Sequence, residues 1–150
     1  MSDSDLRMGA AAALSHAEYV KLAEFRYHLA RFQRRRKDAA RTEGLQAQQY
    51  ELLLAIAGLP DETEPTIKEL AAQLRLEHHT VVELADRLEE RGLLKRSASR
   101  KDRRAVLLQL TRQGKSKLNR IVRDSFAHLP DEAPALIRSL ERILVKRARS

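Results

Sequence analysis

The chain has 150 residues, and 29 Lys and Arg against 21 Asp and Glu give it a formal net charge of +8 at pH 7. This balance favours a polyanionic partner, for which nucleic acid is the first candidate. The absence of cysteine excludes disulfides, thiolate metal sites and thiol-based sensing of peroxides, and it agrees with a reducing cytoplasm, where we expect the protein to reside. Aromatic residues are only 4% of the chain, so aliphatic side chains must build the core of a mainly α fold.

Residues 1–14 are predicted to form a loosely ordered leader. Their acidic start and short Ala-rich stretch do not resemble a secretion signal. The longest apolar run, Leu52–Leu59, is too short to cross a bilayer. We therefore expect no membrane partner.

A long helix is predicted over residues 15–44, with Leu22, Phe25, Leu29 and Phe32 on its apolar face. Its basic run, Arg34–Lys37, fits a solvated helix face or a phosphate contact, and the sequence leaves both open. A second helix follows from about Gln46 to Ala57, with Leu45, Leu52, Leu53 and Ile56 directed inward. The turn-rich loop 58–65 ends it.

The next stretch has the pattern of a helix-turn-helix. Thr66 and Glu69 form a predicted capping box, which marks the start of a helix. A polar break over 75–79 precedes a second apolar stripe, which ends at Gly92, where a helix would stop. The members of the two stripes are Ile67, Leu70, Ala71 and Leu74, then Val81, Leu84, Ala85 and Leu88.

After Gly92 the apolar period changes from 3.6 to 2, which predicts two short strands over 93–98 and 106–110. The cationic segment Arg100–Arg104 lies between them. Two helices followed by a β-hairpin with a basic tip form a winged helix-turn-helix. In such a fold the second helix enters the DNA major groove and the hairpin tip reaches the backbone or the adjacent minor groove.

Thr111 is the predicted cap of the next helix, and we expect Leu129-Pro130-Asp131 to break it before a last helix. The apolar stripes at both ends of the chain exceed what a winged helix needs for its own core. They predict a homodimer in which the N- and C-terminal helices interleave. The stripes of these last helices are Leu118, Ile121, Val122, Phe126 and Leu129, then Leu136, Ile137, Leu140 and Leu144.

Four stretches resemble the MarR (multiple antibiotic resistance regulator) family. Residues 44–50, GLQAQQY, resemble its "GLTPQQ" opening, and 67–71, IKELA, its "I-x-E-L-A" helix. Residues 85–93, ADRLEERGL, resemble "VDRLEERGLV", and 101–111 resemble the wing signature "DRR…LT". The last two at this separation are specific, whereas "ELA" alone would not be.

The resemblance implies a single MarR-type domain over residues 1–150. Helices within 15–44 and 112–149 would form the homodimer interface, and 45–111 would form the winged helix-turn-helix lobe. The implied function is a regulator of transcription that binds palindromic promoter DNA, usually as a repressor. Family members often release DNA when a small aromatic or phenolic ligand binds. The resemblance implies no enzymatic activity and no cofactor.

In the family's D-x-R wing pattern, the residue at the position of Arg104 inserts into the minor groove, where the negative potential is enhanced. We expect Asp102 to hold that guanidinium by a bidentate pair. Arg100, Lys101 and Arg103 would contact phosphates or line the groove. The alternative is a merely solvated hairpin tip.

Base contacts are expected from the start of the recognition helix, at His78, His79, Thr80 and Glu83. The sequence departs here from the common family pattern. Glu77 occupies a position where a Ser cap is usual, and Glu83 one where a basic residue is common, so the base preference of relatives does not transfer. Arg87 is either a backbone contact or an ion-pair partner of Glu83 at i, i+4.

Two ligand hypotheses are weaker. Adjacent His78 and His79 diverge by about 100° on a helix and so do not readily share one ion, and we predict no metal site. An aromatic effector would find an arginine and tyrosines on the first two helices. The alternative for each of these candidates is an ordinary packing or surface residue: His16, Tyr19, Arg26, Tyr27 and Tyr50.

Two other functions fit parts of the sequence. A winged helix can be a protein-interaction module, although such a module needs no cationic tip. A small hydrolase or metalloenzyme would need a nucleophile, a base and a pocket, and the sequence offers no convincing set. A steep dependence of DNA binding on salt would separate a DNA-binding protein from the first alternative.

Overall fold

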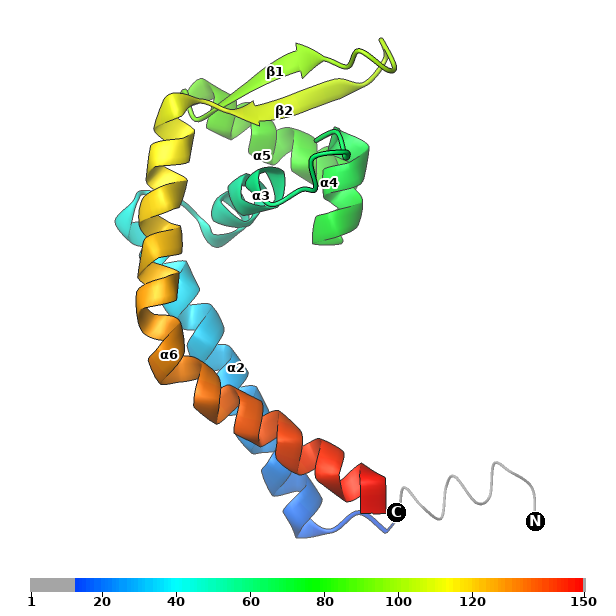
Figure 1. Ribbon diagram of the computed structural model, residues 1–150, viewed down its shortest axis with the longest axis vertical. Helices are drawn as coiled ribbons and strands as arrows, with labels where there is room; N and C mark the ends of the chain where they lie inside the picture. Colours follow the sequence, from blue (N-terminus) through cyan, green and yellow to red (C-terminus); the bar gives the residue numbers. More distant parts are fainter. Residues whose placement is uncertain (1–12, 150) are drawn as a thin grey trace, which may run out of the picture. The chain divides into compact units, whose positions relative to one another are not determined.

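A computed structural model describes residues 13–149; most of the predicted leader therefore lies outside the described residues. The mainly α class with a small antiparallel sheet is confirmed (Figure 1). The elements, in chain order, are α2 (His16–Thr42), α3 (Ala47–Ala57), α4 (Ile67–Leu74), α5 (His78–Glu90), β1 (Leu94–Ala98), β2 (Val106–Leu110) and α6 (Arg112–Arg149).

The chain divides into two compact units. We call Arg36–Phe126 the winged lobe, and we call the described residues of Met1–Arg35 and Ala127–Ser150 the helical unit. The boundaries between the units fall inside α2 and α6.

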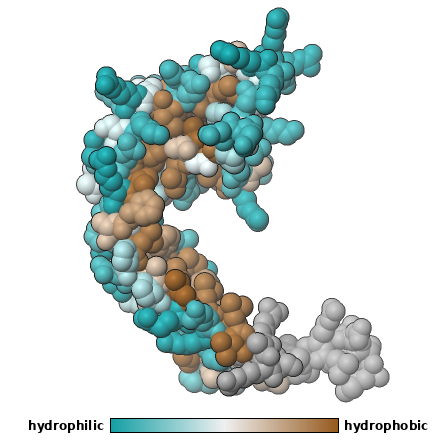
Figure 2. All heavy atoms as spheres, viewed as in Figure 1, coloured by the Kyte–Doolittle hydropathy of each residue, from teal (hydrophilic) through white to brown (hydrophobic). Residues whose placement is uncertain are grey.

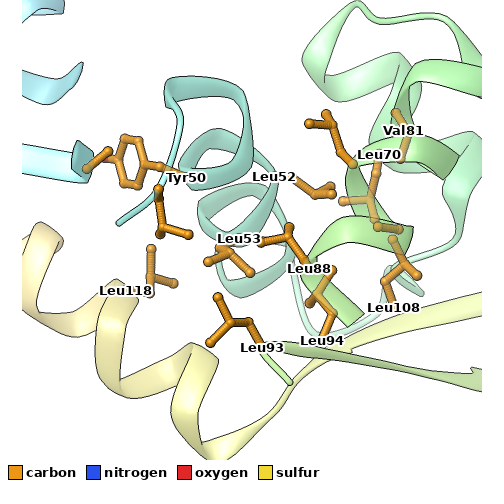
Figure 3. Close-up of a cluster of buried hydrophobic side chains, with 14 of the residues drawn as sticks. Tyr50, Leu52, Leu53, Leu70, Val81, Leu88, Leu93, Leu94, Leu108 and Leu118 are labelled. Carbon is orange, nitrogen blue, oxygen red and sulfur yellow. The ribbon is translucent and has the colours of Figure 1, made fainter. Parts of the chain in front are cut away.

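A leucine-rich core fills the winged lobe. Side chains from α3, α4, α5, the hairpin and the start of α6 converge on it (Figure 3). Each fully buried leucine contributes roughly 1.5–3 kcal/mol relative to an exposed one, so aliphatic burial is enough to build a stable lobe without Trp. The buried apolar residues are Ala40, Leu45, Tyr50, Leu52, Leu53, Leu70, Val81, Leu84, Ala85, Leu88, Leu93, Leu94, Leu108, Leu118 and Ile121.

Local signals set the two helices of the helix-turn-helix. The Thr66 hydroxyl accepts the Glu69 N–H at 3.1 Å, so this half of the predicted capping box is present. Arg75 ends α4 in the left-handed conformation (φ 55°). The break is shorter than predicted, because His78 and His79 already belong to the first turn of α5. Gly92, at φ +73°, follows the end of α5 as expected.

The predicted hairpin is confirmed, with the register running from Leu94 opposite Leu110 to Ala98 opposite Val106. The segment before α4 lies along β2: the Leu108 N–H donates to the Pro65 carbonyl at 2.9 Å, and Thr66 forms a bridge with Leu107. The hairpin is thereby bonded to the helix-turn-helix through the main chain.

The start of α6 is fixed to the turn after α5. The Thr111 hydroxyl accepts the Gly114 N–H at 3.1 Å, which confirms the predicted cap. It also donates to the Gly92 carbonyl at 2.6 Å. At Gly114, a Cβ atom would lie 2.1 Å from the Leu93 carbonyl oxygen, so only glycine fits this close approach.

The predicted helix break at Leu129-Pro130-Asp131 is wrong. Helix α6 continues through Pro130 and Pro134 to Arg149. Each proline removes one main-chain donor, yet the helix is continuous, because most helical stability in a protein comes from tertiary packing. Arg35 Nε lies 2.9 Å from Glu132 Oε1, between the two prolines, and Arg142 pairs with Glu24 further along.

The helical unit contains few buried side chains. Ser139 is 1% exposed, and its hydroxyl donates to the Leu136 carbonyl at 2.7 Å. In contrast, many of its large apolar residues are exposed, and hydrophobic side chains are visible on the surface of this unit (Figure 2). The strongly exposed ones include Tyr19, Leu22, Tyr27, Ile137, Leu144 and Val145.

Candidate nucleic-acid interface

Helix α5 separates a buried face from an exposed one. Val81, Leu84 and Leu88 are buried, and their spacing turns the opposite face to solvent. Of the predicted base-contacting residues, His78, His79 and Glu83 are exposed and Thr80 is partly buried, and the predicted backbone contact Arg87 is exposed. All five are thus placed where a partner could reach at least part of the side chain.

The start of α5 presents the positive end of a helix. Glu77 is the N-cap residue, and its side chain forms no capping hydrogen bond. Its carbonyl accepts the N–H groups of Thr80 (3.1 Å) and Val81 (3.2 Å). An uncapped first turn favours an anion such as a phosphate, although the nearby Glu77 carboxylate opposes one.

Arg96 on β1 pairs with two acidic residues of α5. Its guanidinium lies 2.6 Å from Asp86 Oδ1 and 2.8 Å from Glu89 Oε1. Burial lowers the pKa of Arg96, but the hydrogen bond to Asp86 and the charge of Glu89 outweigh it and raise that pKa. Arg96 therefore stays charged and offsets one of the two carboxylate charges that would repel phosphate.

Arg87 and Glu83 form no ion pair within the described part of the chain. The intrahelical pairing considered for these two residues is therefore not found. The Arg87 side chain is left exposed on the surface of α5. Its expected contact with the DNA backbone stays a prediction.

The wing tip exposes all of its charged side chains, from Arg100 to Arg104. The expected bidentate pairing of Asp102 with the Arg104 guanidinium is wrong for this structure. The Asp102 carboxylate instead accepts the Arg104 main-chain N–H at 3.0 Å, and the Asp102 carbonyl accepts the Ala105 N–H at 3.0 Å. Asp102 thus shapes the turn, as short acidic side chains often do, and the guanidinium stays available.

Ser99 lies at the base of this tip and is only 4% exposed. Its hydroxyl donates to the Glu64 carboxylate, 2.9 Å from Oε1 and 3.1 Å from Oε2. It also accepts the N–H groups of Lys101 and Asp102, both at 3.1 Å. Sequence reasoning missed both Ser99 and Glu64. A serine three residues before an aspartate in a basic loop was the available signal.

The predicted effector residues fall into two groups. His16, Tyr19, Arg26 and Tyr27 are exposed on α2 in the helical unit. Tyr50, in contrast, is 8% exposed in the core of the winged lobe. Burial raises the pKa of Tyr50, so its hydroxyl is a neutral core group.

A cavity of about 570 Å³ lies at the turn from α2 to α3, and none of the five predicted effector residues lines it. Its walls carry two cations, Lys37 and Arg41, beside residues 44–48. Among residues 13–149, no group of three or more acidic, histidine or cysteine side chains could hold a metal ion. No helix in that part of the chain is long and apolar enough to cross a membrane.

Residues 43–105, which span the helix-turn-helix and the wing tip, match the family model described as "MarR family". This segment belongs to the MarR family. A 65-residue alignment is 35% identical to the organic hydroperoxide resistance transcriptional regulator of Bacillus subtilis (strain 168). It covers 43% of this chain and 44% of the relative, so the chain matches less than half of that relative's length.

The MarR-type fold extends beyond the matched segment. A crystal structure of a MarR family transcription regulator has a TM-score of 0.71 at 18% identity and covers 89% of both chains. A mutant MarR from E. coli, complexed with operator DNA, has a TM-score of 0.60 at 22% identity. That comparison covers 79% of this chain and 89% of the other. These similarities establish the fold.

Proposed function

We propose that this protein is a dimeric, sequence-specific DNA-binding regulator of transcription, and a repressor that binds palindromic promoter sites. The observation that carries the proposal is the exposed cationic wing tip attached to the same MarR-type lobe as the exposed face of α5. On this proposal the protein has no enzymatic activity and acts in the cytoplasm, where its DNA lies.

The charge of the lobe's DNA-facing parts supports a backbone-dominated interaction. Arg100, Lys101, Arg103 and Arg104 are exposed together at the tip, and each phosphate contact of this kind makes binding more dependent on salt. The acidic residues Asp86 and Glu89 of α5 oppose this less than two free carboxylates would, because Arg96 pairs with both and offsets one of their charges. Glu83 has no such cation in the described structure, so we assign it to a cytosine N4 amine.

The exposed apolar side chains of the helical unit support dimerisation. Ile137 and Leu144 are 52% and 60% exposed and lie two turns apart on one face of α6. Exposed apolar surface of this kind marks an interaction site. A second copy of the chain is the partner we propose, because a two-fold dimer presents paired α5 helices to the two halves of a palindrome, about 34 Å apart.

Release by a small aromatic ligand is the remaining part of the proposal. Its support is that His16, Tyr19, Arg26 and Tyr27 fall within a sector of about 100° on α2 and are exposed. The Bacillus relative concerns organic hydroperoxide resistance. Because these 150 residues contain no cysteine, the proposal does not include peroxide sensing through a thiol.

The test is DNA binding by fluorescence anisotropy at several salt concentrations. The probe is a duplex selected from a random-sequence library with the unmodified protein, and a scrambled duplex is its control. We expect Arg104→Ala to weaken binding to the selected duplex by roughly 1–3 kcal/mol. Arg112→Ala removes the same charge from an exposed position at the start of α6 and should have a much smaller effect.

Equal affinity of the unmodified protein for both duplexes would contradict sequence-specific binding. If the unmodified protein binds selectively but Arg104→Ala and Arg112→Ala have the same DNA affinity, the protein is still a DNA-binding protein. The role assigned to the wing would then be wrong.

A further inference from the structure

A chain of hydrogen bonds runs from the loop before α4 to the tip of the wing. Glu64 accepts from the Ser99 hydroxyl, which accepts the Lys101 and Asp102 amides. The Asp102 carboxylate then accepts the Arg104 amide at 3.0 Å. The backbone of Arg104 is therefore connected, through two side chains, to Glu64 in the loop before the helix-turn-helix, 35 positions from Ser99 in the sequence.

The carboxylate determines how the serine hydroxyl can act. A hydroxyl has one donor hydrogen and can rotate, whereas an ionised carboxylate only accepts. With its hydrogen directed to Glu64, the Ser99 oxygen has both lone pairs free for the two amides. At 4% exposure, the group is also shielded from water that would compete for these bonds.

The same loop supports the second strand of the hairpin. Pro65, next to Glu64, accepts the Leu108 N–H at 2.9 Å, and Thr66 bridges Leu107. The short segment from Glu64 to Thr66 therefore contacts both sides of the wing: the end of β1 through Ser99 and the middle of β2 through its main chain. The helix that follows, α4, begins directly after this segment.

We propose that Glu64 and Ser99 are positioning residues for DNA binding, which hold the wing tip so that Arg103 and Arg104 meet the groove in a fixed orientation. This inference rests on the proposed function. Neither residue needs to touch DNA: Ser99 is buried, and Glu64 carries the charge that DNA repels. Their contribution is to lower the entropy that the tip would lose on binding.

The first measurement needs no DNA. Amide hydrogen exchange by NMR reports whether Ser99 holds the tip. In Ser99→Ala we expect the Lys101 and Asp102 amides to exchange faster than in the unmodified protein, because their acceptor is gone. Ser97→Ala is the matched control: Ser97 lies two residues earlier on β1, and its side chain forms no hydrogen bond among the described residues. Unchanged exchange at Lys101 and Asp102 in Ser99→Ala would overturn the inference.

The second measurement uses the selected duplex in two backgrounds. Ser99→Ala should weaken binding by roughly 10-fold in the otherwise unmodified chain. It should have little further effect when Arg103 and Arg104 are already alanine, because Ser99 acts through them. A merely structural loss would weaken binding equally in both backgrounds and would overturn the positioning role.

If Ser99→Ala does not fold, variants of Glu64 test the same inference. Glu64→Ala removes the same anchor from its other end and should reproduce the 10-fold loss. Glu64→Gln keeps an acceptor oxygen and should bind nearly as tightly as the unmodified chain. If Glu64→Ala also binds like Ser97→Ala, the inference is wrong. Two outcomes separate this inference from the proposed function. If selective binding is lost in Arg104→Ala but unchanged in Ser99→Ala and Glu64→Ala, only this inference is wrong. If the unmodified protein shows no selective binding, the proposed function itself is wrong.

Discussion

The two units of this protein differ in how much of their apolar surface is buried. In the winged lobe, leucines from α3, α4, α5, both strands and α6 are buried together, and Leu52, Leu70 and Leu88 are fully inaccessible to solvent. In the helical unit, Tyr27 and Leu144 are 62% and 60% exposed. The difference indicates that the lobe contains its own core, whereas the helical unit leaves unburied apolar surface that fits a second copy of the chain.

Polar interactions also differ between the units. The helical unit joins α2 to α6 through the Arg35–Glu132 and Arg142–Glu24 ion pairs; the Glu132 side chain is 7% exposed, whereas its partner and both members of the other pair are partly exposed. Pairs at partly exposed positions contribute little stability. In the lobe, buried Ser99 and the start of α6 use hydrogen bonds to fix loops on a core that is already packed. Stability therefore comes mainly from the core of the lobe and, in the helical unit, from the proposed dimer.

The largest expected effect is on the core of the lobe. Leu52→Ala should lower the free energy of unfolding by about 2–5 kcal/mol, because it removes a fully buried side chain and leaves a cavity. Leu144→Ala makes the same chemical change at a 60% exposed position. At concentrations that keep the protein monomeric, urea denaturation should show little change for Leu144→Ala. Equal losses in the two variants would contradict the contrast between the units.

The next effect concerns the helical unit. Leu144→Glu places a charge on the exposed apolar face of α6, and we expect it to weaken the dimer by about 2 kcal/mol or more, as substitutions at interface hot spots do. Sedimentation equilibrium measures the dissociation constant. Gln113→Glu adds the same charge at an exposed position near the start of α6 and should leave it unchanged. A monomer in the unmodified protein would contradict the dimer proposal.

Gly114→Ala tests how closely the start of α6 packs against the main chain at Leu93. Alanine normally favours a helix over glycine by roughly 0.5–1 kcal/mol. Here the new Cβ would lie 2.1 Å from the Leu93 carbonyl oxygen, so the sign should reverse. We expect a loss of about 1–3 kcal/mol in the free energy of unfolding, measured by urea denaturation. Lys115→Ala, at the exposed next position, should be close to neutral, and a stabilised Gly114→Ala would show that this contact relaxes easily.

Much of the fold could be predicted from the sequence because its signals are local. Apolar periods identified the helices, the change to a period of 2 identified the hairpin, and Thr66 and Thr111 marked two helix starts. The helix break predicted at Pro130 is wrong because the prediction considered only the local effect of proline, whereas contacts between helices determine whether α6 continues. Glu132, between the prolines, and Arg142, further along α6, pair with residues of α2 about 100 positions away in the sequence.

The candidate site was predictable to a lesser degree. The cationic tip follows from composition and from the family resemblance, and the structure exposes it. The partners of Ser99 and Arg96 could not be predicted, because Glu64, Asp86 and Glu89 meet them only once the hairpin folds back on the helices. Gly114 did carry a signal, since a glycine just inside a capped helix often marks a close approach.

The smallest expected effect is at Tyr50, the one predicted effector residue that lies in the lobe. Burial raises the pKa of its hydroxyl. Above about pH 10 the unfolded chain loses this proton while the folded chain keeps it, so the contribution of Tyr50 to stability is present below that pH and declines as pH rises. Tyr50→Phe removes only the hydroxyl and should cost at most roughly 1 kcal/mol near pH 7, the usual net value of one hydrogen bond.

The difference between Tyr50→Phe and the unmodified protein should then narrow as pH rises from about 9 to 11. Urea denaturation across this range measures it, with Tyr27→Phe as the control, since that hydroxyl belongs to a 62% exposed side chain. If the gap stayed constant, Tyr50 would ionise alike in the folded and unfolded chains. Its hydroxyl would then be accessible to water and to a ligand, and Tyr50 would again be a candidate for contact with the effector. If the difference in stability narrows, Tyr50 is a core residue, and the effector proposal then rests on the exposed face of α2.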